Sequence, residues 1–296
     1  MLSTPAFMLS NVQNKRKVLP VAVFLLAVSA SVQCVRCESA TKIKVTDDPT
    51  SLDAVEFMHA RRGLELADRQ DPDRAAREFR YCKDYEKFTD AFLLQMAWSY
   101  FHAGKNEEAV SALDFVIART DRVGSQPKHP SKEFAQALDE RSYCNLYLGK
   151  LDAASADCKR LIAFDIDFKK RIYERQAVIF TREKRYAEAI RAYDAIDAKF
   201  GFDRHNKFER ASCLQRMGRY AEAVNAYSAL LGKMPVSSNS AHDFSESAFF
   251  GSVLAERSKC FDKLGKSALA LADRKQQERL SHTFSTELFP DLPKIK

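Results

Sequence analysis

The sequence contains little glycine and proline, with nine residues of each in a chain of 296. A β-sandwich needs many tight turns, and these two residues are among those that most often form them. Their scarcity argues against a turn-rich β fold and favours long helices. Because 46% of the residues are hydrophobic and 29% are charged, the chain can still fold around a sizeable buried core.

Sequence motifs of catalysis are also missing. There is no glycine-rich phosphate loop, no H-E-x-x-H, no paired C-x-x-C zinc arrangement and no G-x-S-x-G nucleophile elbow. The six histidines lack the spacing of metal ligands. We therefore predict no catalytic residue, no metal site and no cofactor. An enzyme is the least favoured of three functional alternatives, because a site assembled from residues far apart in the sequence would not be detected as a motif.

The net charge of +7 is spread along the chain. Lysine and arginine are interspersed with aspartate and glutamate and do not form the basic blocks typical of nucleic-acid or membrane-surface binding. This pattern predicts a solvated surface of mixed charge and no nucleic-acid partner.

The first thirty residues have the pattern of an export signal. Three cations, Lys15 to Lys17, precede an apolar run from Val18 to Ala30 that ends in small residues. The run is shorter than the ~20 residues of a membrane-spanning helix. We predict a signal peptide over 1–30 and a secreted, periplasmic or cell-envelope location, with an uncleaved signal anchor as the alternative. A flexible linker is expected over 31–51, and Cys34-x-x-Cys37 lies within it.

The rest of the chain repeats itself. ERQAVIFTREKRYAEAIRAYDAI, from Glu174, and ERASCLQRMGRYAEAVNAYSALL, from Glu209, have nearly the same pattern. Aligning such segments places one residue at the same point of each, which we name the closing position: Gln70, Gly104, Gly149, Lys184, Gly218 and Gly265. The unit is about 34 residues long, and two connections, Asp121–Ser131 and Pro235–Ser247, are longer and are expected to be surface loops or short helical extensions.

Each unit is expected to be a pair of helices. Apolar residues recur at three- and four-residue spacing on both sides of the closing position, which glycine suits because it ends a helix easily. An alanine follows five residues later in the last five units, where it allows two helices to approach closely: Ala109, Ala154, Ala189, Ala223 and Ala270. Cys144, Cys213 and Cys260 precede the closing position by five residues and are expected to pack as small apolar side chains.

This pattern resembles the tetratricopeptide repeat. Ala211, Gly218, Tyr220, Ala223, Tyr227 and Pro235 match its signature in order. Some units depart from it, since Lys184 replaces a glycine and Cys158 and Arg274 replace an aromatic residue. The resemblance implies an all-α solenoid of about six helix pairs over 52–280, followed by a C-terminal tail over 281–296.

The resemblance also implies a concave surface, lined by the first helix of each unit, that holds extended peptides or partner helices. Projected onto this chain, it has an aromatic half with Trp98, Phe101, His102, Tyr143 and Tyr147. The basic half is formed by Arg182, Arg216, Lys259 and Lys263. Such a groove would suit an acidic partner segment with bulky side chains. The alternative is that the aromatic residues pack between helices and the basic residues are solvated.

A family variant of this groove grips a peptide's C-terminus with lysine and asparagine. Here Glu140, Glu209 and Glu256 lie near the corresponding places, which argues against that mode. The sequence therefore favours a non-catalytic, exported adaptor or scaffold that binds a protein in its groove. The runner-up is a structural or assembly protein of the cell envelope that self-associates through its end repeats or loops.

Overall fold

The computed structural model describes residues 43–48, 52–122, 130–164, 169–232 and 244–288. These ranges contain twelve α-helices, one short 3-10 helix at Tyr85–Lys87 and no β-strand. The α-helices are α2 (Ala54–Asp68), α3 (Pro72–Phe79), α4 (Asp90–His102), α5 (Asn106–Arg122), α6 (Lys132–Tyr147), α7 (Leu151–Ala163), α8 (Lys169–Arg182), α9 (Tyr186–Phe200), α10 (Arg204–Arg216), α11 (Tyr220–Leu231), α12 (Phe244–Lys263) and α13 (Ser267–Leu288).

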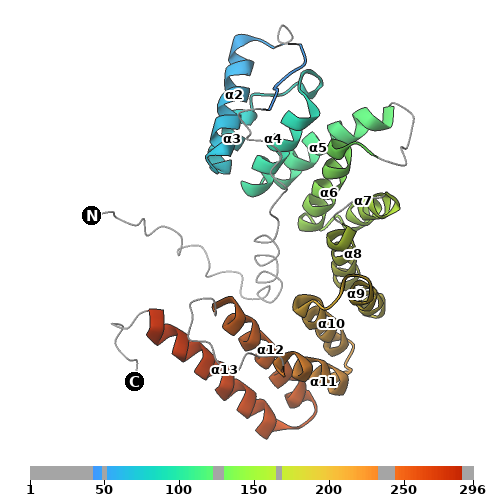
Figure 1. Cartoon of the computed structure of the whole chain (residues 1–296), viewed down its shortest axis with the longest axis vertical. Helices are drawn as coiled ribbons and strands as arrows, with labels where there is room; N and C mark the ends of the chain where they lie inside the picture. Colours follow the sequence, from blue (N-terminus) through green and yellow to red (C-terminus); the bar gives the residue numbers. More distant parts are fainter. Residues whose placement is uncertain (1–42, 49–51, 123–129, 165–168, 233–243, 289–296) are drawn as a thin grey trace.

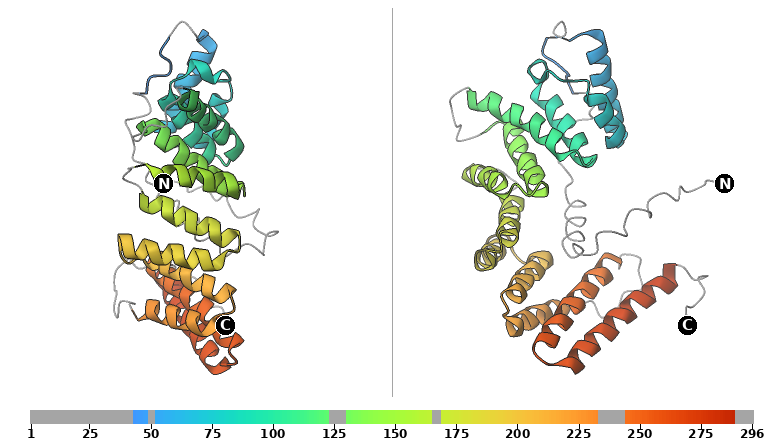
Figure 2. Two further views of the ribbon diagram at one scale, coloured as in Figure 1. Left: turned by 90° about the vertical axis from the view of Figure 1, so that its right-hand side faces the viewer. Right: turned by 180° about the vertical axis from the view of Figure 1, so that it is seen from behind.

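The helices form six pairs, from α2 with α3 to α12 with α13, and the pairs follow one another along an arc (Figure 1). The first helices α4, α6, α10 and α12 lie toward the inner side of this arc, and a view from the side shows the pairs stacked in order along one axis (Figure 2). The predicted all-α solenoid is confirmed. None of the described helices is long and apolar enough to cross a membrane.

All six closing positions adopt the left-handed backbone conformation. Gly104, Gly149, Gly218 and Gly265 have φ between 71° and 77°, and the non-glycine residues Gln70 and Lys184 have φ of 58° and 61°. The helix ends at each of them in a Schellman arrangement, in which the next residue donates its N–H to a carbonyl five residues back, as Arg219 does to Leu214. The left-handed conformation expected for the glycines therefore also occurs at the two closing positions that lack glycine.

Lys184→Gly is expected to stabilise the fourth unit by roughly 0.5–1 kcal/mol, because a side chain makes the left-handed conformation costly. The reverse change, Gly218→Lys, is expected to destabilise the fifth unit by a similar amount. A Cβ at residue 218 would meet no atom within 4 Å, so the effect of Gly218→Lys reports backbone strain without a contribution from a steric clash. Urea denaturation of both variants measures the effect, and equal stability of Lys184→Gly and the wild type would contradict the prediction.

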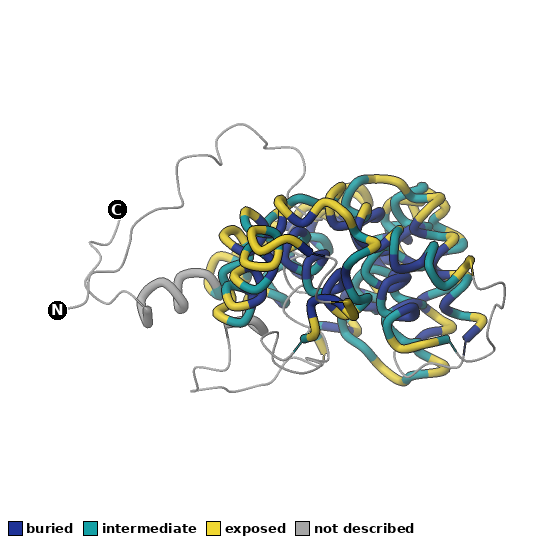
Figure 3. Tube along the Cα trace, turned by 90° about the horizontal axis from the view of Figure 1, so that it is seen from above, coloured by how far each residue is buried: buried dark blue, intermediate teal, exposed yellow. Residues whose placement is uncertain are grey.

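Small residues bring the two helices of each pair together. The alanine five residues after the closing position is fully buried in every unit, at 0% exposure: Ala75, Ala109, Ala154, Ala189, Ala223 and Ala270. Cys144, Cys213 and Cys260 are also buried, and burial raises the pKa of Cys144 to about 12, so its thiol stays protonated and unreactive. The three cysteines pack as apolar side chains, as predicted. Figure 3 shows buried residues recurring along the helices, with exposed residues between them.

Three arginines join neighbouring units. Each lies on a first helix, eight residues before the closing position, and donates to a side chain on the second helix of the preceding unit. The pairs are Arg141 with Asp114 (2.6 Å), Arg210 with Asp194 (2.6 Å) and Arg257 with Ser228 (2.9 Å). Arg141 and Arg257 also form two-point ion pairs within their own units, with Asp157 and Asp273. We name residues at this position clasp arginines.

Described segments of the structure continue past both ends of the predicted repeat domain. Residues 43–48, which fall in the predicted linker, contact the first units: Val45 is buried, and its carbonyl accepts a hydrogen bond from the N–H of Thr89. At the other end α13 continues to Leu288, eight residues into the predicted tail. The predicted signal peptide, Cys34 and Cys37 lie outside the described residues.

Candidate partner-binding site

The candidate site lies on the first helices of the second to fourth units. Trp98, Phe101 and His102 come from the last turns of α4, and Tyr143 and Tyr147 from the last turns of α6. Trp98 and His102 are one helical turn apart on α4, as Tyr143 and Tyr147 are on α6, so each pair shares one face of its helix.

The structure brings these five residues together in one cluster, which we name the aromatic cluster. Trp98 stacks on His102 with ring centroids 4.1 Å apart, and Phe101 lies 5.3 Å from both Tyr143 and Tyr147. These distances are typical of favourable aromatic pairs. His102 is exposed and Trp98 is half-buried, whereas Tyr143 is buried. The cluster thus joins two units and also presents aromatic surface to solvent.

Polar contacts fix the rings in place. The hydroxyl groups of Tyr143 and Tyr147 lie 3.4 Å apart. The carbonyl of Trp98 accepts a hydrogen bond from Nδ1 of His102 at 2.9 Å. The pKa of His102 is lowered because neighbouring groups partly desolvate the ring, although the residue as a whole is exposed and this hydrogen bond opposes the shift. At neutral pH the imidazole is therefore uncharged, and the cluster can bind a partner side chain by apolar contact and stacking.

A buried ion pair supports the cluster from α8. The guanidinium of Arg175 lies 5.1 Å from the ring of Tyr143 and donates to the carboxylate of Asp139 at 2.6 Å. It also donates to the carbonyl of Asp139 and to the hydroxyl of Ser142, while Arg171 donates to the other carboxylate oxygen. Only 5% of the Arg175 side chain and 8% of the Asp139 side chain are exposed. The position of Tyr143 thus depends on a charged network in the core.

The four predicted basic residues have different surroundings. Arg182 is half-buried beside Tyr143 and Tyr147, where it donates to the carbonyl of Leu146 and where burial lowers its pKa. Arg182 therefore lies next to the aromatic cluster, and its role in a basic half of the groove stays a prediction.

The other three cations are spread over α10 and α12. Arg216 lies 6.0 Å from the ring of Tyr186, Lys259 pairs with Glu256 on its own helix at 2.6 Å, and Lys263 is exposed. The repeat pattern predicted the helix on which each of these residues lies, but it did not predict which residues surround it. The C-terminal half of the inner surface therefore carries mixed charge.

Glu209 adds a titratable group to this half. Burial raises the pKa of Glu209 to about 7, although Arg216 opposes the rise, and Glu256 adds to it. Gln215 donates to Glu256 at 3.1 Å and accepts a hydrogen bond from the hydroxyl of the buried Tyr227. The charge of this part of the surface consequently changes near neutral pH.

No arrangement for metal chemistry is present in the described part of the chain, where no group of three or more His, Cys, Asp or Glu side chains could hold an ion. The residues that sequence reasoning missed are Asp139, Arg171 and Arg175. One signal for them existed: Asp139 occupies the repeat position at which the first two units have the buried residues Ala60 and Leu94, although the fourth unit has Glu174 there. A charged side chain that is buried at such a position requires a partner in a folded protein.

Comparison with known proteins supports the architecture. No protein-family model and no curated protein matches the sequence. Solved structures do match: a tetratricopeptide repeat protein from Parabacteroides merdae aligns over 76% of this chain and 79% of its own, with a TM-score of 0.55 and 15% identity.

The tetratricopeptide-like repeats of a putative kinesin light chain from Podospora anserina align over 72% of this chain and 97% of their own, with a TM-score of 0.53 and 16% identity. At such identities the likeness concerns the fold. Together with the repeated left-handed closing positions and the buried alanines, it identifies this chain as an α-solenoid of the tetratricopeptide-repeat type.

Proposed function

We propose that the protein is a non-catalytic binding module that holds an extended peptide or a helix of a partner protein at the aromatic cluster. The single observation that supports this most is the partly exposed stack of Trp98 and His102, which packs on Phe101, and Phe101 in turn packs on the two tyrosines. Rigid aromatic side chains bury a large area at a small entropic cost and commonly dominate binding energy.

The chemistry of the cluster favours a partner segment with bulky apolar or aromatic side chains. Because the guanidinium groups of Arg182 and Arg216 lie on the next two first helices, carboxylates farther along the same segment would be attracted to them. The apolar part supplies affinity and the charged part supplies orientation. We further propose that the chain acts after export, on the basis of the signal-like pattern in residues 1–30.

Trp98→Ala is expected to weaken capture of the partner by roughly tenfold or more, since removal of a central aromatic anchor typically costs 2 kcal/mol or more. The measurement is affinity capture from the native host with the chain from Ser31 onward as bait, followed by quantitative mass spectrometry. Phe202→Ala is the matched control, because Phe202 is 54% exposed and lies outside the cluster.

Thermal unfolding of both baits shows whether they are folded before capture. A partner that binds wild type and Phe202→Ala but not Trp98→Ala supports the proposal. Equal capture by all three baits would place the binding surface elsewhere.

A further inference from the structure

The first unit has a clasp arginine that makes the contact within its own unit but not the contact to a preceding unit. Arg62 lies eight residues before the closing position Gln70, as Arg141 and Arg257 do in their own units. Its Nε lies 3.4 Å from the carboxylate of Glu78, sixteen residues later. The same sixteen-residue step joins Arg141 to Asp157 and Arg257 to Asp273. The contact within the unit therefore occurs at the same repeat positions in all three units.

The contact to a preceding unit has no counterpart, because no described helix precedes α2. In the later units Asp114, Asp194 and Ser228 make that contact. As a result 64% of the Arg62 side chain is exposed, against 20% for Arg141, 29% for Arg210 and 18% for Arg257.

The residues at the other junctions follow the same electrostatic rule. Where the second helix of one unit places Lys159 or Arg80 at the partner position, the next first helix has Gln176 or Met96 in place of the arginine. A clasp arginine thus occurs only opposite a side chain that can accept a hydrogen bond. By this rule Arg62 fits a helix that presents an acceptor.

We name the exposed surface of α2 that contains Val55, Met58 and Arg62 the end face. It resembles the surface by which the later units contact the unit before them. Val55 and Met58 on α2 are 61% and 51% exposed. In the five later units the position of Met58 is fully or almost fully buried: Phe92, Ala137, Ile172, Asn206 and Val253. The apolar part of the end face is therefore a position that the repeat normally covers with protein.

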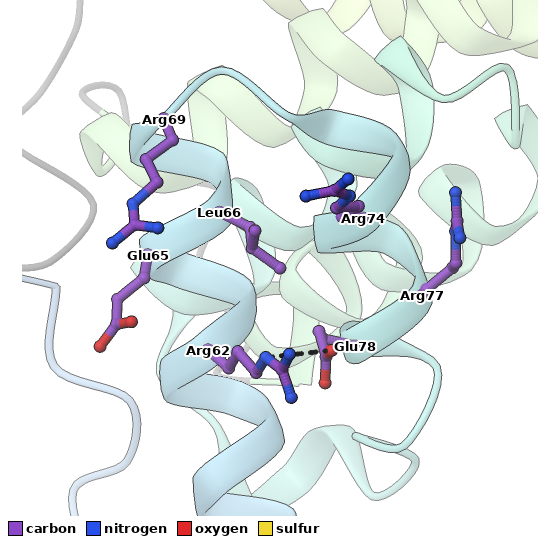
Figure 4. A pocket seen from close by; sticks show the side chains of 7 residues that line it. All are labelled: Arg62, Glu65, Leu66, Arg69, Arg74, Arg77 and Glu78. Atoms are coloured by element: carbon purple, nitrogen blue, oxygen red, sulfur yellow. Dashed lines mark ion pairs between the residues drawn. The ribbon is translucent and has the colours of Figure 1, made fainter.

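Next to it lies a pocket of about 340 Å³ between α2 and α3. Figure 4 shows its lining, in which four arginines from the two helices surround Leu66: Arg62, Arg69, Arg74 and Arg77. Glu65 and Glu78 are the acidic residues of the lining, and Glu78 is already paired with His59 and Arg62. The pocket has an excess of positive charge.

We propose that the end face binds an acidic amphipathic helix of another protein, which packs on α2 as the second helix of a preceding unit would. Its apolar side covers Val55 and Met58, and a carboxylate reaches Arg62 in the way that Asp114 reaches Arg141. Further carboxylates pair with Arg69 and Arg77, while Arg74 is already paired with Asp71 at 3.4 Å. This surface is separate from the aromatic cluster on α4 and α6.

Charge distinguishes this occupant from the two that the chain itself could supply. In a head-to-tail contact between copies, α13 would place Lys275 at the partner position, opposite Arg62. Residues 1–42 contain five cations and a single acid, Glu38. Both would bring like charges together, which disfavours association.

The test uses a helix that already fits a clasp arginine in this protein. A fluorescent, hydrocarbon-stapled peptide of residues 106–122, the sequence of α5, carries Asp114 and is titrated with the full chain while anisotropy is measured. Saturable binding is expected. Arg62→Glu in the chain or Asp114→Lys in the peptide should each weaken it by roughly tenfold or more, and combining the two should restore it.

Lys159→Glu, an exposed change on α7, is the control and should leave binding unchanged. The proposal is overturned by an absence of saturable binding, or by binding that is insensitive to Arg62→Glu, which would point to displacement of the native α5. Self-association that increases with concentration and is abolished by Arg62→Glu would also overturn it, since the occupant would then be a second copy.

Discussion

Replacing Asp139 with alanine is expected to lower the stability of the third and fourth units by about 3–5 kcal/mol, because it leaves the buried guanidinium of Arg175 without its counter-ion. Arg175 has 5% of its side chain exposed and lies against Tyr143, so water cannot replace the carboxylate without disrupting the aromatic cluster. The loss should be local, since solenoid stability is roughly a sum of units and interfaces.

Hydrogen exchange measured by mass spectrometry can locate the effect. Peptides from α6 and α8 should lose protection, while α12 and α13 should change little. The double variant Asp139→Leu/Arg175→Met is the control, because replacing a buried ion pair with apolar residues of similar size is often close to neutral. A single variant as stable as the wild type, or a double variant as unstable as the single one, would show that the pair does not have this role.

Raising the pH from 5 to 8 is expected to destabilise the fifth unit through Glu209. The pKa of this carboxyl rises from 4.5 to about 7 on folding, so between these values the folded state holds a proton that the unfolded state has released. Stability supplied by the proton is complete below pH 4.5 and is lost as the pH rises toward 7. At 1.36 kcal/mol per unit, the change amounts to about 3 kcal/mol at most, and less to the extent that solvent reaches the carboxyl.

Glu209→Gln removes the titration and should be more stable than the wild type at pH 8, with a flatter dependence on pH. Glu222→Gln is a suitable control, because Glu222 is an exposed glutamate paired with Arg219 on the surface. Chemical denaturation at pH 5, 6, 7 and 8 measures the difference between the curves. Parallel curves for wild type and Glu209→Gln would contradict the assigned pKa shift.

The repeating features of the fold could be predicted because each is fixed within a single unit. The spacing around Gly218 predicts a helix, a left-handed residue and a second helix, and the structure shows the same arrangement around Lys184, where glycine is absent. Ala223 and Cys213 could be assigned to the interior for the same reason, because their place in the unit repeats elsewhere.

Contacts between units were harder to predict. Arg175 and Asp139 are 36 residues apart, and their meeting depends on how α8 packs on α6. The sequence shows which position of the repeat each residue occupies. It does not show which residues of neighbouring units come into contact when their helices pack. For the same reason the sequence predicted the helix on which Arg182 lies but not the hydrogen bond from Arg182 to the carbonyl of Leu146.

The most direct test of the account is site-specific photo-crosslinking at the aromatic cluster. A benzophenone amino acid replaces His102, which is exposed in the cluster, or Ala153, which is exposed on the second helix α7. Each protein is illuminated in the native host, and crosslinked products are identified by mass spectrometry. A discrete protein partner is expected to be crosslinked at residue 102 and not at residue 153. Crosslinking of the same partner at both positions, or only at residue 153, would contradict a binding site on the first helices.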